Sequence, residues 1–476
     1  MSDKASSPKK PANLLAHAIE LVMNEGHMTK FQGNSLIASM LSQHFRPLPV
    51  SELTITERQF PYRVRADLQR AINRLFNETT RVTHFCGVKK QYDHNGITFS
   101  DLIYPSRNDP AVSIPPQFEE VDIGEAEPAR CLKNGFWLVE DTDCKFAVFL
   151  APAQQFGRTT GVEFHVAAPR NDGGQKWTQQ FFKHLEESVL RSEFYRGKIL
   201  SLEVGEMYSG MSAGVRVHKL RTVERDQVIL PGKTLELLDR NIIQFAQQRK
   251  RLAEFRMSTK KGLLFYGPPG TGKTHTIHYL AGAMRGHTTL LITAEQVGLL
   301  AEYMTLARLL QPSIVVIEDA DLIARERSTI GSTCEEILLN KLLNEMDGLR
   351  PETDVFFILT TNRPQALEAA LASRPGRIDQ AIEFPLPDAE GRQKLVNLYS
   401  GGLNVTGHVV EATINRTEGV SASFIKELMR RAAQFHLEKD DGNEISIEDI
   451  NRALEELLFA NGSLNHALLG VQSPKT

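Results

Sequence analysis

Cysteine is scarce in this sequence, and its spacing excludes two kinds of protein. The four cysteines are Cys86, Cys131, Cys144 and Cys334, with no CxxC pair among them. Zinc sites and disulfide frameworks need shorter and more regular spacings. We therefore interpret all four as reduced thiols that pack like small hydrophobic side chains, and we expect a reducing, cytoplasmic location.

Long apolar runs and an excess of charge are also missing. No stretch approaches the ~20 apolar residues of a membrane-spanning helix, and residues 1–11 lack an apolar signal core and read as a disordered tail. The formal net charge is -3, so no global field attracts nucleic acid or an anionic membrane. The sequence thus predicts no membrane span and argues against nucleic acid as a partner.

The first half of the chain shows secondary-structure patterns but no catalytic constellation. Apolar residues at helical spacing predict a helical N-terminal segment over 12–84. Short strand-like runs, turn clusters and one amphipathic helix predict an α+β domain over 85–225. Because no reactive group stands out, we assign recognition of a client or partner to this domain.

The second half shows alternating helices and buried strands. This pattern predicts an α/β domain with a parallel sheet over 226–390. Residues 391–460 are helical in pattern and predict a small lid, and 461–476 read as a flexible C-terminus.

A glycine-rich loop follows the predicted strand 262–266 and matches the pattern GxxxxGK[ST]. The residues of this loop are Gly267, Pro268, Pro269, Gly270, Thr271, Gly272, Lys273 and Thr274. Glycines let backbone N–H groups surround a polyphosphate, and the next helix presents its positive end to it. We expect Lys273 to reach the β- and γ-phosphates of ATP, and the Thr274 hydroxyl to bind Mg²⁺.

Two adjacent acids, Glu318 and Asp319, end the apolar run 314–317. A P-loop ATPase needs one acid on the metal side and a second acid to polarise the attacking water. Acids at a strand end can instead cap the following helix. The upstream phosphate loop favours the catalytic interpretation.

Taken together, these motifs resemble the AAA clade of the AAA+ ATPases over about residues 226–458. The matching stretches are 262–274, 318–321, 344–349 (NEMDGL), 360–364 (TTNRP) and 374–379 (RPGRID). The resemblance implies a P-loop core with a parallel sheet and helices on both faces, followed by a small α-helical lid. It also implies ATP and Mg²⁺ as ligands and a homo-oligomer, a hexamer in that family.

The resemblance also assigns roles to single residues. Asn362 matches sensor 1, which orients water against the γ-phosphate, and Arg374 and Arg377 match arginine fingers that act on a neighbouring subunit. Surface salt bridges are the alternative for the two arginines.

Three lid residues match positions that line the adenine site of the family: Tyr399, Ala422 and Ser423. For Tyr399, stacking on the nucleotide and packing within the lid both stay open.

Two departures from the family pattern bear on mechanism. The family order is Asp-Glu, whereas this chain has Glu318 then Asp319. We assign Glu318 to the metal and Asp319 to the water, and the shorter side chain suggests slow hydrolysis. The pore-loop region, 294–303, also lacks the aromatic triplet of threading enzymes, and Tyr303 is too close to the next helix to replace it. Both departures resemble the mitochondrial translocase of folded Rieske protein.

The preferred hypothesis is an ATP-hydrolysing ring that remodels, disassembles or translocates a protein client. A nucleotide-gated oligomeric scaffold with slow turnover is the alternative, and a nucleic-acid motor is a third hypothesis that the net charge disfavours.

Overall fold

The computed structural model describes two compact units. The described residues are 36–91, 96–104, 109–141, 144–155, 158–203, 214–325, 342, 344–345, 348, 353–365, 367, 377–439 and 442–459. One unit comprises Met1–Val121 and Ala129–Val189, and the other comprises Asp122–Pro128 and Leu190–Thr476. The expected tail 1–11, the first part of the expected helical segment and the expected C-terminus 461–476 lie outside the described residues.

The first unit is built on a six-stranded antiparallel sheet in the order β1-β8-β7-β6-β2-β3, with a separate β4-β5 pair. Its helices and strands are α2 (Ile37–His44), η2 (Val50–Glu52), β1 (Leu53–Pro61), η3 (Tyr62–Val64), α3 (Arg65–Arg74), η4 (Leu75–Thr79), β2 (Arg81–Lys89), α4 (Phe99–Ile103), β3 (Val112–Ile114), β4 (Phe118–Val121), β5 (Ala129–Leu132), β6 (Gly135–Asp141), β7 (Cys144–Gln155), β8 (Arg158–Pro169) and α5 (Asp172–Leu190).

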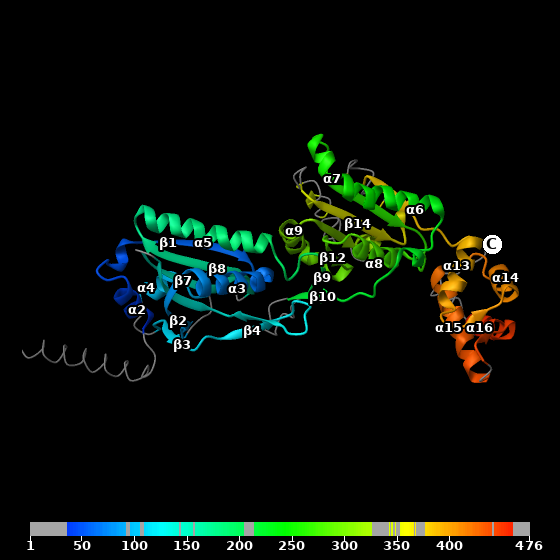
Figure 1. The fold of residues 1–476 in the computed structure, drawn as a ribbon, viewed down its shortest axis with the longest axis horizontal. Coiled ribbons are helices and arrows are strands. Elements are labelled where there is room, and N and C mark those ends of the chain that lie inside the picture. The colour runs from blue at the N-terminus through cyan, green and yellow to red at the C-terminus, as the bar shows by residue number, and fades with distance from the viewer. Residues whose placement is uncertain are drawn as a thin grey trace, which may run out of the picture. The chain divides into compact units, whose positions relative to one another are not determined.

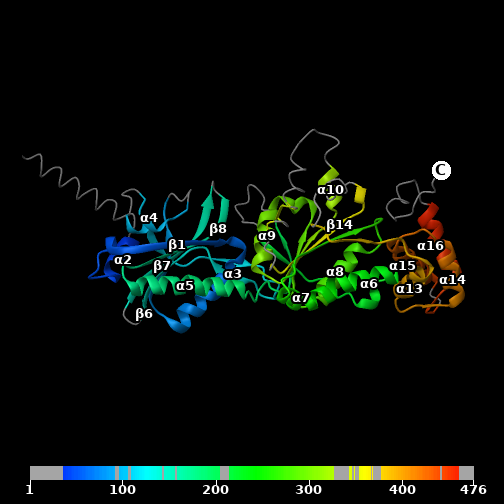
Figure 2. The ribbon, with the colours of Figure 1, turned by 90° about the horizontal axis from the view of Figure 1, so that it is seen from above.

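Helices cover both faces of this sheet because its central strands are apolar on both sides. On one face, α2 and α4 pack against β6 and β7, with Phe149 in their shared core. On the other face, Trp177 of α5 stacks on Phe146 of β7 with ring centroids 4.0 Å apart. Helices α4 and α5 accordingly lie on opposite sides of the strands (Figure 2). Cys86 and Cys131 are buried, free thiols, and Cys144 is also free, as expected.

The expected helical segment 12–84 is wrong in part, since β1 occupies 53–61 and pairs with β8. This strand lies at the sheet edge and is largely exposed. Its polar sequence, TITERQ at 54–59, therefore lacks the apolar alternation by which a strand is recognised.

The second unit contains a seven-stranded sheet in the order β10-β9-β12-β13-β14-β11-β15. All neighbouring strands are parallel except β10 and β9. The helices and strands of this core are β9 (Ile199–Leu202), β10 (Val215–His218), η5 (Arg225–Gln227), α6 (Gly232–Leu238), η6 (Asp239–Gln244), α7 (Phe245–Glu254), β11 (Lys261–Tyr266), α8 (Lys273–Ala283), β12 (Thr288–Ile292), η7 (Ala294–Leu299), α9 (Leu300–Leu309), β13 (Ser313–Ile317), α10 (Ala320–Arg325), β14 (Val355–Thr361) and β15 (Gln380–Glu383).

Helices cover both faces of the parallel sheet, so the predicted α/β architecture is confirmed. Helices α6 and α8 share a core with β11, β13 and β14 on one face. Helices α9 and α10 lie on the opposite side of the strands (Figure 2). Strands β13 and β14 are buried along their whole length, which explains their continuous apolar sequences.

The expected domain boundary at 225/226 is also wrong, because β9 and β10 belong to the sheet of the second unit (Figure 1). Strand β9 has four residues and pairs with β12, about ninety residues further along the chain. Nothing in such a short stretch of sequence indicates the sheet that it joins.

Helices α13 to α16 occupy the range in which we expected the lid, and they are called the lid below. Its elements are α13 (Ala389–Tyr399), β16 (Asn404–Val405), α14 (Gly407–Arg416), α15 (Ala422–Lys439), β17 (Glu444–Ile445) and α16 (Ile447–Phe459). These elements pack around their own apolar core. In the described part of the chain, no helix combines the length and the apolar character needed to cross a bilayer.

Candidate nucleotide-binding site

The loop between β11 and α8 has a backbone that only glycine adopts easily. Gly267, Gly270 and Gly272 have φ angles of 150°, 75° and 97°. A Cβ atom on Gly267 would lie 2.2 Å from the carbonyl oxygen of Phe384. Glycine is therefore required at Gly267 both by conformation and by space. This geometry fits a loop whose N–H groups surround an anion.

Lys273 begins α8 and folds its amine back over the loop. Its Nζ donates hydrogen bonds of 2.9 Å to the carbonyl oxygens of Gly267 and of Pro268. The side chain is buried, and this burial lowers the pKa of Lys273 to about 8, against the opposing effect of Asp319 and Asp321. A buried cation thus lies beside the glycine loop.

Thr274 and Glu318 meet although 44 residues separate them in the sequence. The Thr274 hydroxyl donates a hydrogen bond of 2.9 Å to Glu318 Oε1. The Glu318 backbone is fixed by its own N–H, which donates to Ile292 O and extends the pairing of β12 with β13. A hydroxyl and a carboxylate oxygen are ligands of the type that Mg²⁺ prefers, so the residues present fit this ion.

Asp319 faces a different partner from Glu318. Its carboxylate Oδ1 accepts a hydrogen bond of 3.1 Å from Asn362 Nδ2. Its φ angle of 47° is left-handed, and its N–H donates to Thr360 Oγ1 at 3.0 Å. The structure therefore places Glu318 beside Thr274 and Asp319 beside Asn362.

The lid also contacts the phosphate loop, through Ser423 at the start of α15. Ser423 N donates a hydrogen bond of 3.1 Å to Gly270 O. Ala422 is the first residue of this helix. Tyr399, by contrast, is packed against the apolar core of the lid, where burial raises the pKa of its phenol. The contacts of Tyr399 support the packing interpretation.

Comparison with known proteins agrees with this geometry. The model of the ATPase family associated with various cellular activities (AAA) matches residues 263–386. The proteasome-activating nucleotidase of Methanosphaerula palustris is 34% identical over 213 residues, which are 42% of this chain and 51% of that protein. Over residues 263–386 this chain therefore resembles the AAA ATPases.

A second proteasome-activating nucleotidase, from Methanopyrus kandleri, is 35% identical over 214 residues, or 42% of this chain and 48% of that protein. The chain therefore spans about half the length of these curated relatives. The crystal structure of the FIGL-1 AAA domain aligns with 47% of this chain and 80% of that chain, at a TM-score of 0.41 and 23% identity.

The arginine motif at 374–379 is only partly described. Arg374 lies outside the described residues. Arg377 is 9% exposed in its own protomer, where it has interactions within the chain. In this conformation Arg377 is therefore not presented to a neighbouring subunit.

Tyr303 is a buried residue with hydrogen bonds inside the second unit. It is fully buried, its hydroxyl accepts a hydrogen bond of 2.7 Å from Leu202 N, and it donates one of 3.0 Å to Gln296 Oε1. Gln296 Nε2 closes the ring by donating to Leu202 O at 2.8 Å. The region 294–303 is thus bonded to the end of β9 and presents no aromatic clamp from Tyr303.

Sequence reasoning missed the segment 224–230, which precedes α6. His275 Nε2 of α8 lies 3.2 Å from Gln227 O, Ile229 packs against the lid core, and Leu230 packs against the core of the sheet. This segment therefore borders α8, the lid and the sheet. Only the match to the family could have indicated it, because its composition is ordinary.

Asp321 was quoted in the acidic motif but was given no role. It is buried, and it accepts hydrogen bonds from the residues that end β14. Its position could have indicated a role, because it lies two residues beyond Asp319 in the same acidic motif.

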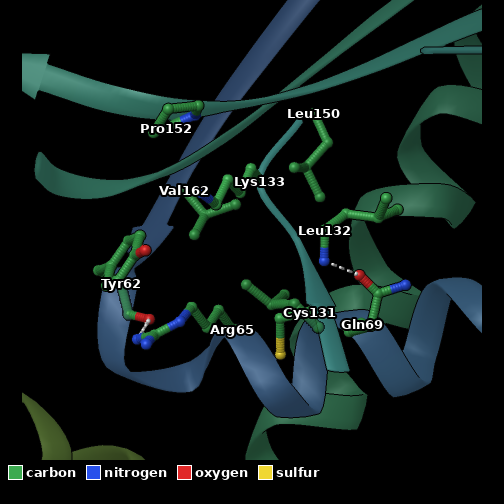
Figure 3. A pocket seen from close by; sticks show the side chains of 10 residues that line it. Tyr62, Arg65, Gln69, Cys131, Leu132, Lys133, Leu150, Pro152 and Val162 are labelled. Atoms are coloured by element: carbon green, nitrogen blue, oxygen red, sulfur yellow. Dashed lines mark hydrogen bonds between the residues drawn. The ribbon is translucent and has the colours of Figure 1, made fainter. Parts of the chain in front are cut away.

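A cavity in the first unit offers no comparable site. It is lined by Tyr62, Arg65, Gln69, Cys131 and apolar side chains (Figure 3). Its volume of about 20 Å³ has room for little more than one water molecule. The burial of Cys131 raises the pKa of its thiol to about 12, so this group is also unreactive.

Proposed function

We propose that this chain hydrolyses ATP with Mg²⁺ and acts as a homo-oligomeric ring that remodels a protein client. The observation that carries the proposal is that three sets of side-chain contacts lie at one edge of the sheet. Lys273 lies over the glycine loop, Thr274 bonds to Glu318, and Asp319 bonds to Asn362.

Each of these side chains has a distinct task. The loop amides and the Lys273 ammonium bind the phosphates. Thr274 and Glu318 hold Mg²⁺, which neutralises charge on the β- and γ-phosphates when it is bound. Asp319 accepts a proton from the attacking water, and Asn362 orients this water and the carboxylate.

The nucleotide base lies between the core and the lid. Segment 224–230 and the start of α15, with Ala422 and Ser423, border this region beside the phosphate loop. Tyr399 supports the lid from within its core. Closure of the lid over ATP would exclude water from everything except the attacking position.

The ring is needed because part of the catalytic charge comes from a neighbouring subunit. Arg374 serves as the finger that stabilises the transition state in trans, and Arg377 supports it from within the protomer. A hexamer is the ring size that the family resemblance implies.

The client is a protein, and the first unit recognises it. Two observations support this: the similar nucleotidases are named for activating a proteasome, and the first unit is a separate compact body with its own core. Without an aromatic clamp at 294–303, threading by that device is excluded from the proposal. Reduced, buried thiols agree with a cytoplasmic location.

The test is affinity capture with Asp319→Asn, beside nucleotide-binding and phosphate-release assays. We expect wild-type protein to release phosphate, Asp319→Asn to retain ATP and client, and Lys273→Ala to lose nucleotide. Protein that binds no adenine nucleotide in magnesium buffer contradicts the proposal.

A second candidate, a nucleotide-gated scaffold, is favoured by the short Asp319 side chain at the water position. It predicts ATP-dependent assembly with turnover below ~0.1 s⁻¹, against a median enzyme turnover of ~10 s⁻¹. Phosphate release measured against oligomer size separates the two functions.

A further inference from the structure

A buried carboxylate lies behind the catalytic edge of the sheet and touches neither the glycine loop nor the metal-side pair. Asp321 is 4% exposed. Its Oδ1 accepts two hydrogen bonds, one of 2.8 Å from the Thr361 hydroxyl and one of 3.2 Å from Asn362 N. Both donors come from the end of β14, 40 residues away in the chain.

The Thr361 hydroxyl extends this contact to the next peptide group. It is fully buried, it donates to Asp321, and it accepts a hydrogen bond of 2.9 Å from Arg363 N. Asn362 N and Arg363 N are consecutive amides, and both are tied to Asp321, one directly and one through Thr361. The backbone that carries the Asn362 side chain is therefore fixed on both sides.

Asp321 does not cap its own helix. It lies in the first turn of α10, yet the hydrogen bonds of its carboxylate go to β14. In the described part of the chain, no lysine or arginine lies within ion-pair distance of Asp321. An ordinary helix cap or salt bridge therefore does not account for keeping a carboxylate buried here.

The position of Asn362 matters because Asp319 is short. Asn362 Nδ2 lies 3.1 Å from Asp319 Oδ1, and the Asp319 backbone is held in its left-handed conformation by Thr360. An aspartate reaches less far than a glutamate, so its alignment with water depends on where its partners hold it.

We propose that Asp321 and Thr361 are positioning residues for hydrolysis, which place Asn362 against Asp319. The inference rests on the proposed ATPase function and assigns a role to two side chains that touch no substrate. Because their hydrogen bonds act on the alignment of the water step, their loss should lower kcat. ATP binding should stay in place below the pKa of Lys273, which the Asp321 charge also raises.

The experiment compares Asp321→Asn, Thr361→Val and Thr361→Ser in the full chain. Asp321→Asn removes the charge with little change in shape, and Thr361→Val removes the hydroxyl, whereas Thr361→Ser keeps it. We expect kcat to fall about tenfold or more in the first two variants, with the Kd for ATP and KM changed less than about twofold. Thr361→Ser should stay close to the wild-type rate.

Asp449→Asn is the matched control. Asp449 is a buried aspartate of the lid that accepts a hydrogen bond from the Ser446 hydroxyl and forms an ion pair with Lys439. Its substitution should lower thermal stability without a comparable loss of kcat. Because Asp321 and Thr361 act through one network, the double variant should be no slower than the slower single variant.

The outcomes are distinct. No hydrolysis by the wild-type protein overturns the proposed function itself. Wild-type hydrolysis with an unchanged kcat in Thr361→Val overturns only the positioning role, and so does a loss of ATP affinity as large as the loss of kcat. Should Asp321→Asn fail to fold, the pair Thr361→Val and Thr361→Ser decides the question.

Discussion

Lys273, which is proposed to bind the phosphates of ATP, carries its charge in a buried place that disfavours charge. Burial lowers the pKa of Lys273 to about 8 in the free protein, whereas bound phosphate favours the protonated amine. Above pH 8 the amine must therefore take up a proton when ATP binds. The affinity for ATP should be constant below this pH and fall by up to about tenfold per pH unit above it.

Titration of a fluorescent ATP analogue between pH 7 and 9.5 checks this prediction. Burial lowers the pKa values of His275 and His278, so these neighbours stay neutral across the range. A Lys273→Arg variant keeps its charge and should lose the pH dependence. Equal affinities for the wild-type protein at pH 7 and 9.5 would contradict the prediction.

Gly267 allows a second test at single-residue resolution. A methyl group there would overlap the carbonyl oxygen of Phe384, 2.2 Å away, and would have to accept a φ of 150°. We expect Gly267→Ala to lower stability by about 1–3 kcal/mol and to weaken nucleotide binding. Gly282→Ala, a change with open space around it in α8, is the control and should be neutral or slightly stabilising.

How far residues could be predicted depended on whether their partners are near in sequence. The residues of the glycine loop are consecutive in the sequence, so its phosphate-binding chemistry could be predicted from the sequence alone. Different partners for Glu318 and Asp319 could be expected, because neighbouring side chains at a strand end point in different directions. The link between Asp321 and Thr361 spans 40 residues and two strands, and only the pairing of β13 with β14 brings these residues together.

Elements were predicted well where both faces are buried and poorly at sheet edges. Strands β13 and β14 have continuous apolar sequences and were placed correctly. Strands β1, β9 and β10 lie at or next to an edge, and long-range pairing decides which sheet they join. Their sequences are short or polar, so local pattern could not assign them to a sheet, even where it indicated a strand as at β9.

The bonded ring of Tyr303, Gln296 and Leu202 gives a prediction for one such element. Tyr303→Phe removes a buried hydroxyl and leaves Leu202 N without its acceptor. We expect a loss of about 1–3 kcal/mol in the free energy of unfolding, measured by urea denaturation. In Tyr399→Phe the lost hydroxyl has no hydrogen bond among the described residues, so this variant should be nearly neutral. Equal effects would refute the role of the ring.

The whole molecule should be active only as an assembly, because the proposed mechanism takes an arginine from a neighbouring subunit. Lys273→Ala and Arg374→Ala should each be inactive alone, since one loses its phosphate contact and the other its finger. Mixed rings contain some interfaces where both groups are intact, so an equal mixture should recover about a quarter of the wild-type rate. Co-purification through two tags confirms mixing, and mixed rings without activity would exclude action in trans.

The Glu318-Asp319 order determines which acid should be substituted in a variant designed to retain ATP and client. Substituting the glutamate of the pair, which is the second acid in the family order, would here alter Glu318, whose carboxylate meets Thr274. Such a substitution would remove a proposed Mg²⁺ ligand. It would thereby weaken the binding of the nucleotide that the variant is meant to retain. The side chain to neutralise is therefore Asp319. A classification that relies on the Asp-Glu order alone would class this site as inactive.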